Sequence, residues 1–244
     1  MRIDILTLFP GMFRGPFDES IVKRAVEAGV VEIHVHDIRD WAEGKHSVVD
    51  DYPYGGGPGM VAKPEPVFAA TEAVLAMAAE RGPIVLMTPV GRRFDHNVAV
   101  ELAREKRLVI LCGHYEGFDA RVHDQLATDE ISVGDFVLSG GEIPAMVVVD
   151  AIVRQLPGAL GCSESKEQES FADGLLEAPH YTRPPEFRGW AVPEVLLSGH
   201  HVEVEKWRRR QNLLLTARRR PELLSGVHVS NEDRDWLAEQ GIEL

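Results

Sequence analysis

The stretch RLVILCGHYEGFDAR, residues 107–121, decides the fold class. It begins with an apolar run, 108–111, that is typical of a short strand buried on both faces of a sheet. A glycine-bearing loop follows, and a helical pattern then covers 119–126. A strand, a loop and a helix in this order form the repeating unit of folds with parallel sheets.

The same unit recurs on both sides of this stretch. The apolar or alternating runs predict further strands at 2–8, 31–36, 83–87 and 130–133. Helical patterns predict helices at 20–28, 66–80, 95–104 and 141–154. Residues 1–160 are therefore predicted to form one α/β domain with a mostly parallel sheet.

The pattern changes after residue 160. Residues 161–172 are polar and lack periodicity, so we expect a flexible linker there. Helical spacing returns at 200–219 and again at 231–240, where Asn231 is the expected N-cap. Residues 173–244 are predicted to form a small helical C-terminal domain.

The composition is that of a globular protein, with 44% hydrophobic and 27% charged residues among 244. No apolar run approaches the roughly 20 residues that a membrane span needs. We therefore expect a cytoplasmic protein without a membrane partner. Cys112 and Cys162 form no CxxC pair, which favours free thiols over a zinc site or a disulfide.

Charge is unevenly distributed along the chain. The net charge is −13, which argues against a protein that coats nucleic acid non-specifically. Yet KWRRRQNLLLTARRR, residues 206–220, contains seven basic residues and no acidic one. This segment is either a local site for a phosphate backbone or a solvated helix face.

Three glycine-bearing loops follow three successive predicted strands, at 88–93, 112–121 and 132–142. Ligands of α/β sheets bind beyond the carboxyl ends of the strands, so these loops either form a composite pocket or are three ordinary turns. A fourth glycine-rich loop, 50–60, is equally compatible with a phosphate cradle, a mobile lid or a long turn.

Several longer blocks carry a resemblance to a known family. They are PYGGGPGM at 53–60, GHYEGFDAR at 113–121, ISVGDFVLSGGE at 131–142, SFADGLLEAPHYTRP at 170–184, and LSGHH with KWRRRQ and RRPELL within 197–224. Together they resemble the bacterial tRNA (guanine-37-N1)-methyltransferases, the TrmD family. The resemblance implies a SPOUT-type fold with a trefoil knot in the C-terminal part of the α/β domain, and a homodimer with shared active sites. It also implies transfer of a methyl group from S-adenosylmethionine to N1 of the guanosine 3′ of the anticodon.

The resemblance assigns roles to individual residues. The methyl-donor contacts would be Thr88, Pro89, Gly113, Tyr115, Glu116, Gly117, Val133, Gly134, Asp135, Phe136, Val137, Leu138, Gly140 and Gly141. The tRNA contacts would be Lys206, Arg208, Arg209, Arg210, Arg218, Arg219 and Arg220. A magnesium ion is expected from the family, but no carboxylate cluster in the sequence has metal-ligand spacing.

The catalytic pair implied by the resemblance is Glu169 and Arg154. Guanine N1 carries a proton, which a carboxylate can remove, and a fixed arginine can stabilise the charge that develops on O6. The family has Asp where this chain has Glu169, so the base is one methylene longer here. Two further departures are Glu177, where Asp is expected, and His114, where many relatives have Arg.

Two other functions remain open on the sequence. A methyltransferase of the same fold could act on a ribose hydroxyl, although that chemistry would not require the block at 170–184. A catalytically inactive RNA-binding module would be expected to have broken donor loops, whereas the three loops are intact here.

Overall fold

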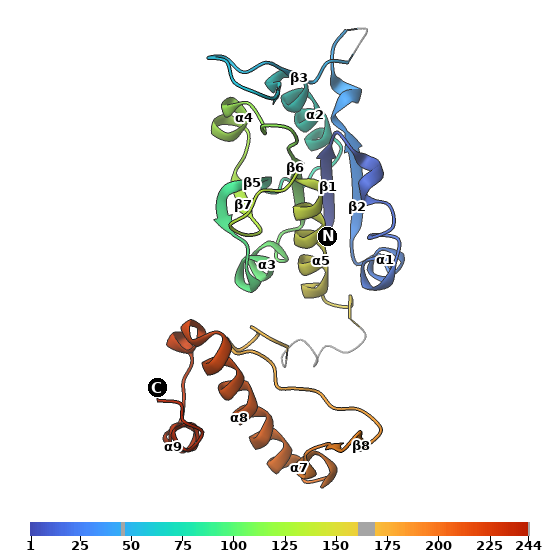
Figure 1. The fold of residues 1–244 in the computed structure, drawn as a ribbon. Helices are drawn as coiled ribbons and strands as arrows, with labels where there is room; N and C mark the ends of the chain where they lie inside the picture. Colours follow the sequence, from blue (N-terminus) through green and yellow to red (C-terminus); the bar gives the residue numbers. More distant parts are fainter. Residues whose placement is uncertain (45–46, 161–168, 244) are drawn as a thin grey trace. The chain divides into compact units, whose positions relative to one another are not determined.

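The computed structural model describes residues 1–44, 47–160 and 169–243 (Figure 1). The chain divides into two compact units, unit 1 at Met1–Gly161 and unit 2 at Cys162–Leu244. The linker expected at 161–172 lies outside the described residues except for 169–172, and Cys162 lies outside them as well.

Unit 1 contains the predicted parallel sheet. Its described strands are β1 (Arg2–Thr7), β2 (Glu32–Asp37), β5 (Ile84–Arg93), β6 (Arg107–Cys112) and β7 (Asp129–Ser132). They lie in the order β2-β1-β6-β5-β7, with parallel pairing between neighbours. The α/β architecture with a central parallel sheet is thus confirmed.

The predicted helices of unit 1 are also present, with small shifts at their ends (Figure 1). They are α1 (Ser20–Glu27), α2 (Pro64–Ala76), α3 (His96–Leu102), α4 (Ala120–Gln125) and α5 (Glu142–Gln155), with 3₁₀ turns η1 (Pro10–Phe13) and η2 (Ile38–Trp41). A short antiparallel pair, β3 (Asp50–Asp51) and β4 (Val61–Ala62), encloses the glycine-rich loop.

The sheet is buried on both faces, which explains the apolar strands. Along β6, Leu108 and Ile110 pack with residues of α1, α3 and α5, whereas Val109 and Leu111 pack with residues of α2 and α4. Burying each such side chain contributes roughly 1.5–3 kcal/mol. The strands that hold the loops at their carboxyl ends are therefore fixed by packing from two sides.

A buried charge cluster connects β1, β6 and α2. The fully buried Arg107 side chain donates to Asp4 Oδ2 at 2.9 Å and to the Val74 carbonyl at 2.6 Å. Burial alone would raise the pKa of Asp4, but hydrogen bonds from His36, Arg2 and Arg107 outweigh it and hold that pKa well below its usual range. The arginine also donates to the Leu75 carbonyl at 3.0 Å, in the last turn of α2, where helix carbonyls run out of amide partners.

Unit 2 is smaller and mainly helical. Its elements are β8 (Glu186–Phe187), β9 (Trp190–Ala191), α7 (Glu194–Leu197), α8 (His201–Arg219), η3 (Pro221–Gly226) and α9 (Asn231–Glu239). The buried core consists of Leu175, Leu213, Val229 and Leu237. Along helix α8, Leu213 and Thr216 are buried, and the other residues are partly or fully exposed.

The N-cap predicted for the last helix is wrong by one residue. Ser230 has extended backbone angles, and its side chain accepts a hydrogen bond from the amide of Asp233 at 3.1 Å. Asn231 is already the first helical residue. Both are residue types that favour the cap, and the backbone geometry selects Ser230.

Candidate active site

The first glycine-bearing segment, 88–93, is a bulge within strand β5. The prediction that a loop directly follows Met87 is therefore wrong. Strand β5 continues to Arg93, and its pairing with β7 shifts register between Met87 and Arg92. A Cβ on Gly91 would lie 2.4 Å from the backbone carbon of Glu130, so glycine permits this close approach. Thr88, Pro89 and Val90 are thereby displaced from the regular strand.

The second and third segments meet each other. Residues 113–119 connect β6 to α4, and residues 133–141 connect β7 to α5. The amide of Gly141 donates to the carbonyl of Gly113 at 2.7 Å, and His114 forms an isolated bridge with Gly140. A Cβ on Gly141 would lie 2.8 Å from Cys112 Cα, which leaves no room for a side chain.

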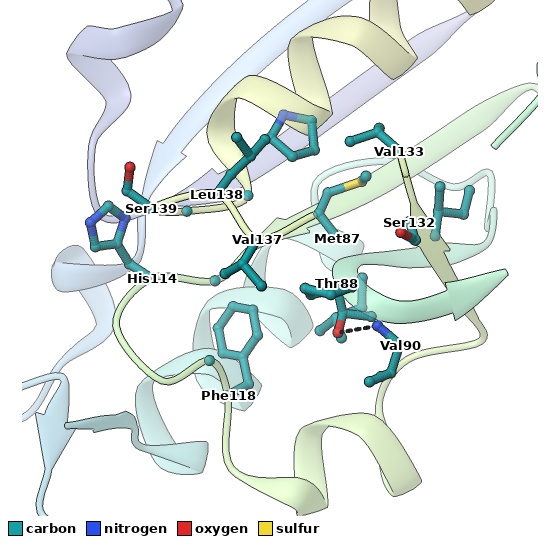
Figure 2. Close-up of a pocket in the computed structure, with 18 of the residues that line it drawn as sticks. Met87, Thr88, Val90, His114, Phe118, Ser132, Val133, Val137, Leu138 and Ser139 are labelled. Carbon is teal, nitrogen blue, oxygen red and sulfur yellow. Dashed lines mark hydrogen bonds between the residues drawn. The ribbon is translucent and has the colours of Figure 1, made fainter. Parts of the chain in front are cut away.

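The three segments enclose a cavity of about 390 Å³ (Figure 2). This volume is within the range of small-molecule sites. Among the fourteen residues assigned above to donor binding, Asp135 is exposed and does not line the cavity, whereas the others do. In Figure 2, Thr88 and Val90 lie at one end of the cavity and His114 and Ser139 at the other.

Sequence reasoning missed several residues of the cavity wall. They include Met87, Val90, His114, Phe118, Ser132 and Ser139. Each is adjacent to an assigned residue or lies within one of the three loops, so the loop boundaries were the available signal. Thr88 Oγ1 accepts a hydrogen bond from the Val90 amide at 3.4 Å, which helps to hold the bulge.

The fourth, glycine-rich loop lies against the second one. The amide of Glu116 donates to the Met60 carbonyl at 3.0 Å, and the amide of Ala62 donates to the Gly117 carbonyl at 2.9 Å. Gly59 has a positive φ of 86°, and a Cβ there would meet Glu116 Oε1 at 2.5 Å. Glycine at this position therefore allows the loop to pack closely on the Glu116 side chain.

The two residues predicted to be catalytic lie in different units. Arg154 is in the last turn of α5 in unit 1. Glu169 is in unit 2, where its carbonyl accepts a hydrogen bond from the Ala172 amide at 3.2 Å. The turn closes with the Phe171 amide donating to the carbonyl of buried Leu175 at 2.7 Å. Glu169 is thus the first residue of a turn that hydrogen-bonds to the backbone of a core residue of unit 2.

The block 170–184 also forms a hydrogen bond with α8. The amide of Leu176 donates to Thr216 Oγ1 at 2.9 Å, and the amide of Glu177 donates to Ser170 Oγ at 2.9 Å. Glu177 Oε1 lies 2.7 Å from His180 Nε2. Glu177, which replaces the expected Asp, therefore pairs with a histidine of the same block.

Most of the basic residues of 206–220 pair with acidic side chains of unit 2. Lys206 and Arg210 lie 2.5 and 3.2 Å from Glu232, Arg208 lies 3.1 Å from Glu205, Arg209 lies 3.3 Å from Asp173, and Arg220 pairs with Glu222. In the part of the chain that is described, no acidic partner faces the exposed Arg218 and Arg219. Exposed ion pairs are weak, so the paired residues can still exchange an acid for a phosphate.

A second cavity, of about 370 Å³, lies within unit 2. Its wall includes Tyr181 and Trp207, whose ring centroids are 6.4 Å apart, together with His180 and Arg208. The aromatic and basic residues that flank the prolines of 179–185 are a weak sequence signal for this cavity.

The described residues provide neither a metal centre nor a membrane span. Among 1–44, 47–160 and 169–243, no three His, Cys, Asp or Glu side chains are grouped to hold a metal ion. Within the same residues no helix is long and apolar enough to cross a membrane.

Cys112 is buried, and burial together with nearby Glu142 raises the pKa of its thiol well above the usual value.

Comparisons with known proteins identify the family. Residues 1–226 match the family described as tRNA (Guanine-1)-methyltransferase TrmD. A tRNA (guanine-N(1)-)-methyltransferase of Dehalococcoides mccartyi is 55% identical over 239 residues, which cover 98% of this chain and 96% of that protein. Proteins of the same name from Geotalea uraniireducens and Pelotomaculum thermopropionicum are each 59% identical, again over 98% of this chain and 96% of the relative.

These matches extend over both units and include the three cavity-forming segments and the block at 170–184. The chain therefore belongs to the TrmD family of tRNA (guanine-N1)-methyltransferases, and it is an enzyme that methylates tRNA.

Proposed function

We propose that this enzyme transfers the methyl group of S-adenosylmethionine to N1 of guanosine 37, the nucleoside 3′ of the anticodon, in cytoplasmic tRNA. The observation that carries the proposal is the convergence of three distant glycine-bearing segments on one cavity of about 390 Å³. The residues that the family resemblance assigns to the methyl donor line this cavity, apart from Asp135.

The cavity fits a ligand that combines apolar and polar parts. Its wall presents apolar side chains such as Val137 and Leu138 beside backbone groups of glycines that allow close approach. When bound, S-adenosylmethionine supplies an electrophilic methyl group on a sulfonium sulfur. The loops of unit 1 would hold it, with Gly113 and Gly141 bringing backbone atoms against it.

The catalytic groups are proposed to come from both units. Glu169 would accept the N1 proton of guanine, because a neutral guanine N1 is a poor nucleophile while it carries that proton. Arg154 would stabilise the negative charge that develops on O6, since its guanidinium stays protonated. Proton removal is thus assigned to the turn at 169–175, and charge stabilisation to helix α5.

A homodimer would bring these groups together. On α5, Ile143 and Val147 are 50% and 49% exposed, and their spacing places them on the same face as Arg154. An exposed apolar face of this kind favours a protein interface. We infer that α5 packs against a second copy of the chain, with Arg154 at the edge of the shared site.

The interface can be tested by sedimentation at micromolar concentration. The wild-type protein is expected to sediment at twice the chain mass of 27.1 kDa, and Ile143→Asp with Val147→Asp is expected to sediment as the monomer. Val202→Asp is the matched control, because Val202 is an exposed apolar residue on α8. A monomeric wild-type protein would rule out the shared site.

The SPOUT-type knot is part of the same proposal. Support comes from the path of the third segment, which leaves edge strand β7 and returns to the end of β6, where Gly141 bonds Gly113. A crystal structure of the donor complex would test it, because a continuous chain trace either threads a loop here or passes outside it.

A magnesium ion is part of the proposal only because the family resemblance implies it. The residues that the structure describes contain no group of three acidic or other metal-binding side chains. Proton removal and charge stabilisation are assigned to Glu169 and Arg154, and no residue is assigned to the ion.

Methyl transfer to two transcripts tests the proposed substrate. A tRNA with guanosine at position 37 is expected to accept labelled methyl groups, and the same tRNA with adenosine there is not. Equal labelling of both would favour a ribose methyltransferase, and the absence of labelling in both would favour a non-catalytic RNA-binding protein.

A further inference from the structure

A chain of buried polar groups lies behind the cavity, outside the residues assigned to the donor. Glu142, the first residue of α5, is only 1% exposed. The Phe9 amide donates to Thr7 Oγ1 at 2.9 Å, and the Thr7 hydroxyl donates to Glu142 Oε1 at 2.7 Å. Because an amide can only donate, the hydroxyl proton of Thr7 is directed at the carboxylate.

The second oxygen of this carboxylate faces a histidine of the cavity wall. Glu142 Oε2 lies 3.5 Å from His114 Nδ1, longer than a good hydrogen bond. Both atoms are buried, and within the described residues neither has a hydrogen-bond partner. A buried carboxylate oxygen that accepts no hydrogen bond is unfavourable, so a small movement that shortens this distance would be stabilising.

Two aromatic rings and a glycine lie next to the pair. The His114 ring lies 4.5 Å from the Phe9 ring and 5.3 Å from the Tyr115 ring, measured between centroids. A Cβ on Gly140 would lie 2.3 Å from Glu142 Oε2 and 2.4 Å from His114 Nδ1. Glycine at position 140 is therefore required for the pair to approach at all.

The pair also connects two of the cavity-forming segments. His114 belongs to the second segment and forms a bridge with Gly140 of the third, and Glu142 follows that segment directly. Both His114 and Gly140 line the cavity, and Figure 2 shows His114 beside Ser139. A shorter distance between His114 and Glu142 would draw the two segments together around a bound ligand.

We propose that Glu142, held by Thr7, orients His114, and that the two close to hydrogen-bonding distance when the methyl donor binds. Thr7, Glu142 and His114 are then positioning residues for the donor pocket. The proposal rests on the proposed function for the identity of the ligand. The hydrogen bond that the proposal requires runs from the Nδ1–H of His114 to Glu142 Oε2.

Calorimetric titration with S-adenosylmethionine tests the role of His114 without requiring catalysis. His114→Leu keeps a side chain of similar volume but removes the N–H group that would donate to Glu142. It is expected to raise the Kd for S-adenosylmethionine about tenfold. His114→Asn places an amide donor near the position of Nδ1, and is expected to recover the wild-type Kd to within about threefold. A residue that merely filled space would show the opposite order.

Thr7→Val provides an independent route, because it preserves shape and leaves His114 in place. It is expected to raise the Kd severalfold, and to add little to His114→Leu in the double variant, because both act through Glu142. In steady-state assays the KM for the donor should rise, with the KM for tRNA unchanged. Additive effects of the two substitutions would overturn the proposed coupling of Thr7 to His114 through Glu142.

The control is a second histidine–glutamate pair. His34 Nε2 lies 3.5 Å from Glu32 Oε2 on edge strand β2, and both side chains are exposed, so His34→Leu removes a similar contact at a surface site and should leave the Kd unchanged. Wild-type protein that does not bind the donor would overturn the proposed function and this inference with it. Wild-type binding together with an unchanged Kd in His114→Leu would overturn this inference alone.

Discussion

The two units of the chain are built on different physical principles. In unit 1 a parallel sheet is buried on both faces, and even its charged residues Asp4 and Arg107 are fully enclosed and paired. In the described part of unit 2 the buried apolar cluster is small, formed by Leu175, Leu213, Val229 and Leu237, and ion pairs lie on the surface. Ion pairs of that kind contribute little stability and rearrange readily.

This difference matches the two tasks of a tRNA methyltransferase. A small donor needs a pocket formed in advance, and unit 1 places its three segments on strands that packing holds in position. A phosphate backbone is long and variable, and exposed arginines that can change partners suit it better. Donor binding should therefore depend on tight packing in unit 1, and tRNA binding on adaptable charge in unit 2.

The largest effect is expected at Glu169, the proposed general base. Glu169→Gln removes the proposed base and should slow single-turnover methyl transfer by roughly 10²–10⁴-fold, the usual range for a positioned base. Donor and tRNA affinities should stay unchanged, as measured by calorimetry and filter binding. Glu169→Asp, which restores the residue typical of the family, should recover much of the rate.

Glu167 is the control for this assignment, since it is an acid two residues earlier in the sequence. A wild-type rate in Glu169→Gln combined with a slow Glu167→Gln would move the base by two positions. Wild-type rates in both variants would mean that this segment does not remove the proton.

The next effect concerns the buried charges of unit 1. Asp4→Asn leaves Arg107 buried without its carboxylate, and should lower the free energy of unfolding by about 3–5 kcal/mol. Urea denaturation followed by circular dichroism measures this change. Asp124→Asn, at an exposed position on α4, is the control, and an equal effect of the two substitutions would contradict the account.

The same carboxylate predicts a dependence of stability on pH. The pKa of Asp4 is lowered in the folded protein, so its contribution is present above the unfolded-state pKa of about 4 and is lost as the pH falls below it. Melting temperatures of the wild type should fall in that acidic range more steeply than those of Asp4→Asn. Parallel curves would show that Asp4 contributes nothing specific.

A glycine substitution sharpens the claim that the donor pocket depends on tight packing. Gly141→Ala forces a Cβ to within 2.8 Å of Cys112 Cα, and should weaken donor binding by at least about tenfold. Gly11→Ala is the matched control in the same unit, because no atom lies within 4 Å of its added Cβ. Calorimetry that finds the wild-type Kd for Gly141→Ala would refute the pocket assignment.

The smallest effect is expected from the basic face of unit 2. Arg208→Ala with Arg209→Ala should weaken tRNA binding severalfold, about equally for good and poor substrates, and should reduce the salt slope by roughly one per lost phosphate contact. Arg234→Ala, at an exposed position on α9, is the control. An unchanged salt slope for tRNA binding in the double variant would show that Arg208 and Arg209 face solvent and contact no phosphate.

The sequence predicted the regular elements well because their signals are local. The apolar run 108–111 and the helical pattern at 141–154 need no knowledge of distant residues. The extension of β5 to Arg93 was missed because it depends on the approach of Gly91 to Glu130 on another strand. The contact between His114 and Glu142 was missed for the same reason, since residues 28 positions apart meet through the folding of two loops.

The roles of the site residues came from family resemblance, because spacing alone left three ordinary turns as an alternative. The convergence of those loops on one cavity is a property of the folded sheet. The pairing of Glu169 with Arg154 rests on the resemblance alone, since the two residues belong to different units and the segment 161–168 between them lies outside the described residues.

The most direct test of the central claim is to map the methyl group. Unmodified tRNA is incubated with the enzyme and isotopically labelled S-adenosylmethionine, digested, and analysed by mass spectrometry of fragments and nucleosides. The account predicts a single labelled product, 1-methylguanosine, in the fragment that contains position 37. Label on a ribose 2′-oxygen, or on a guanosine at any other position, would contradict it.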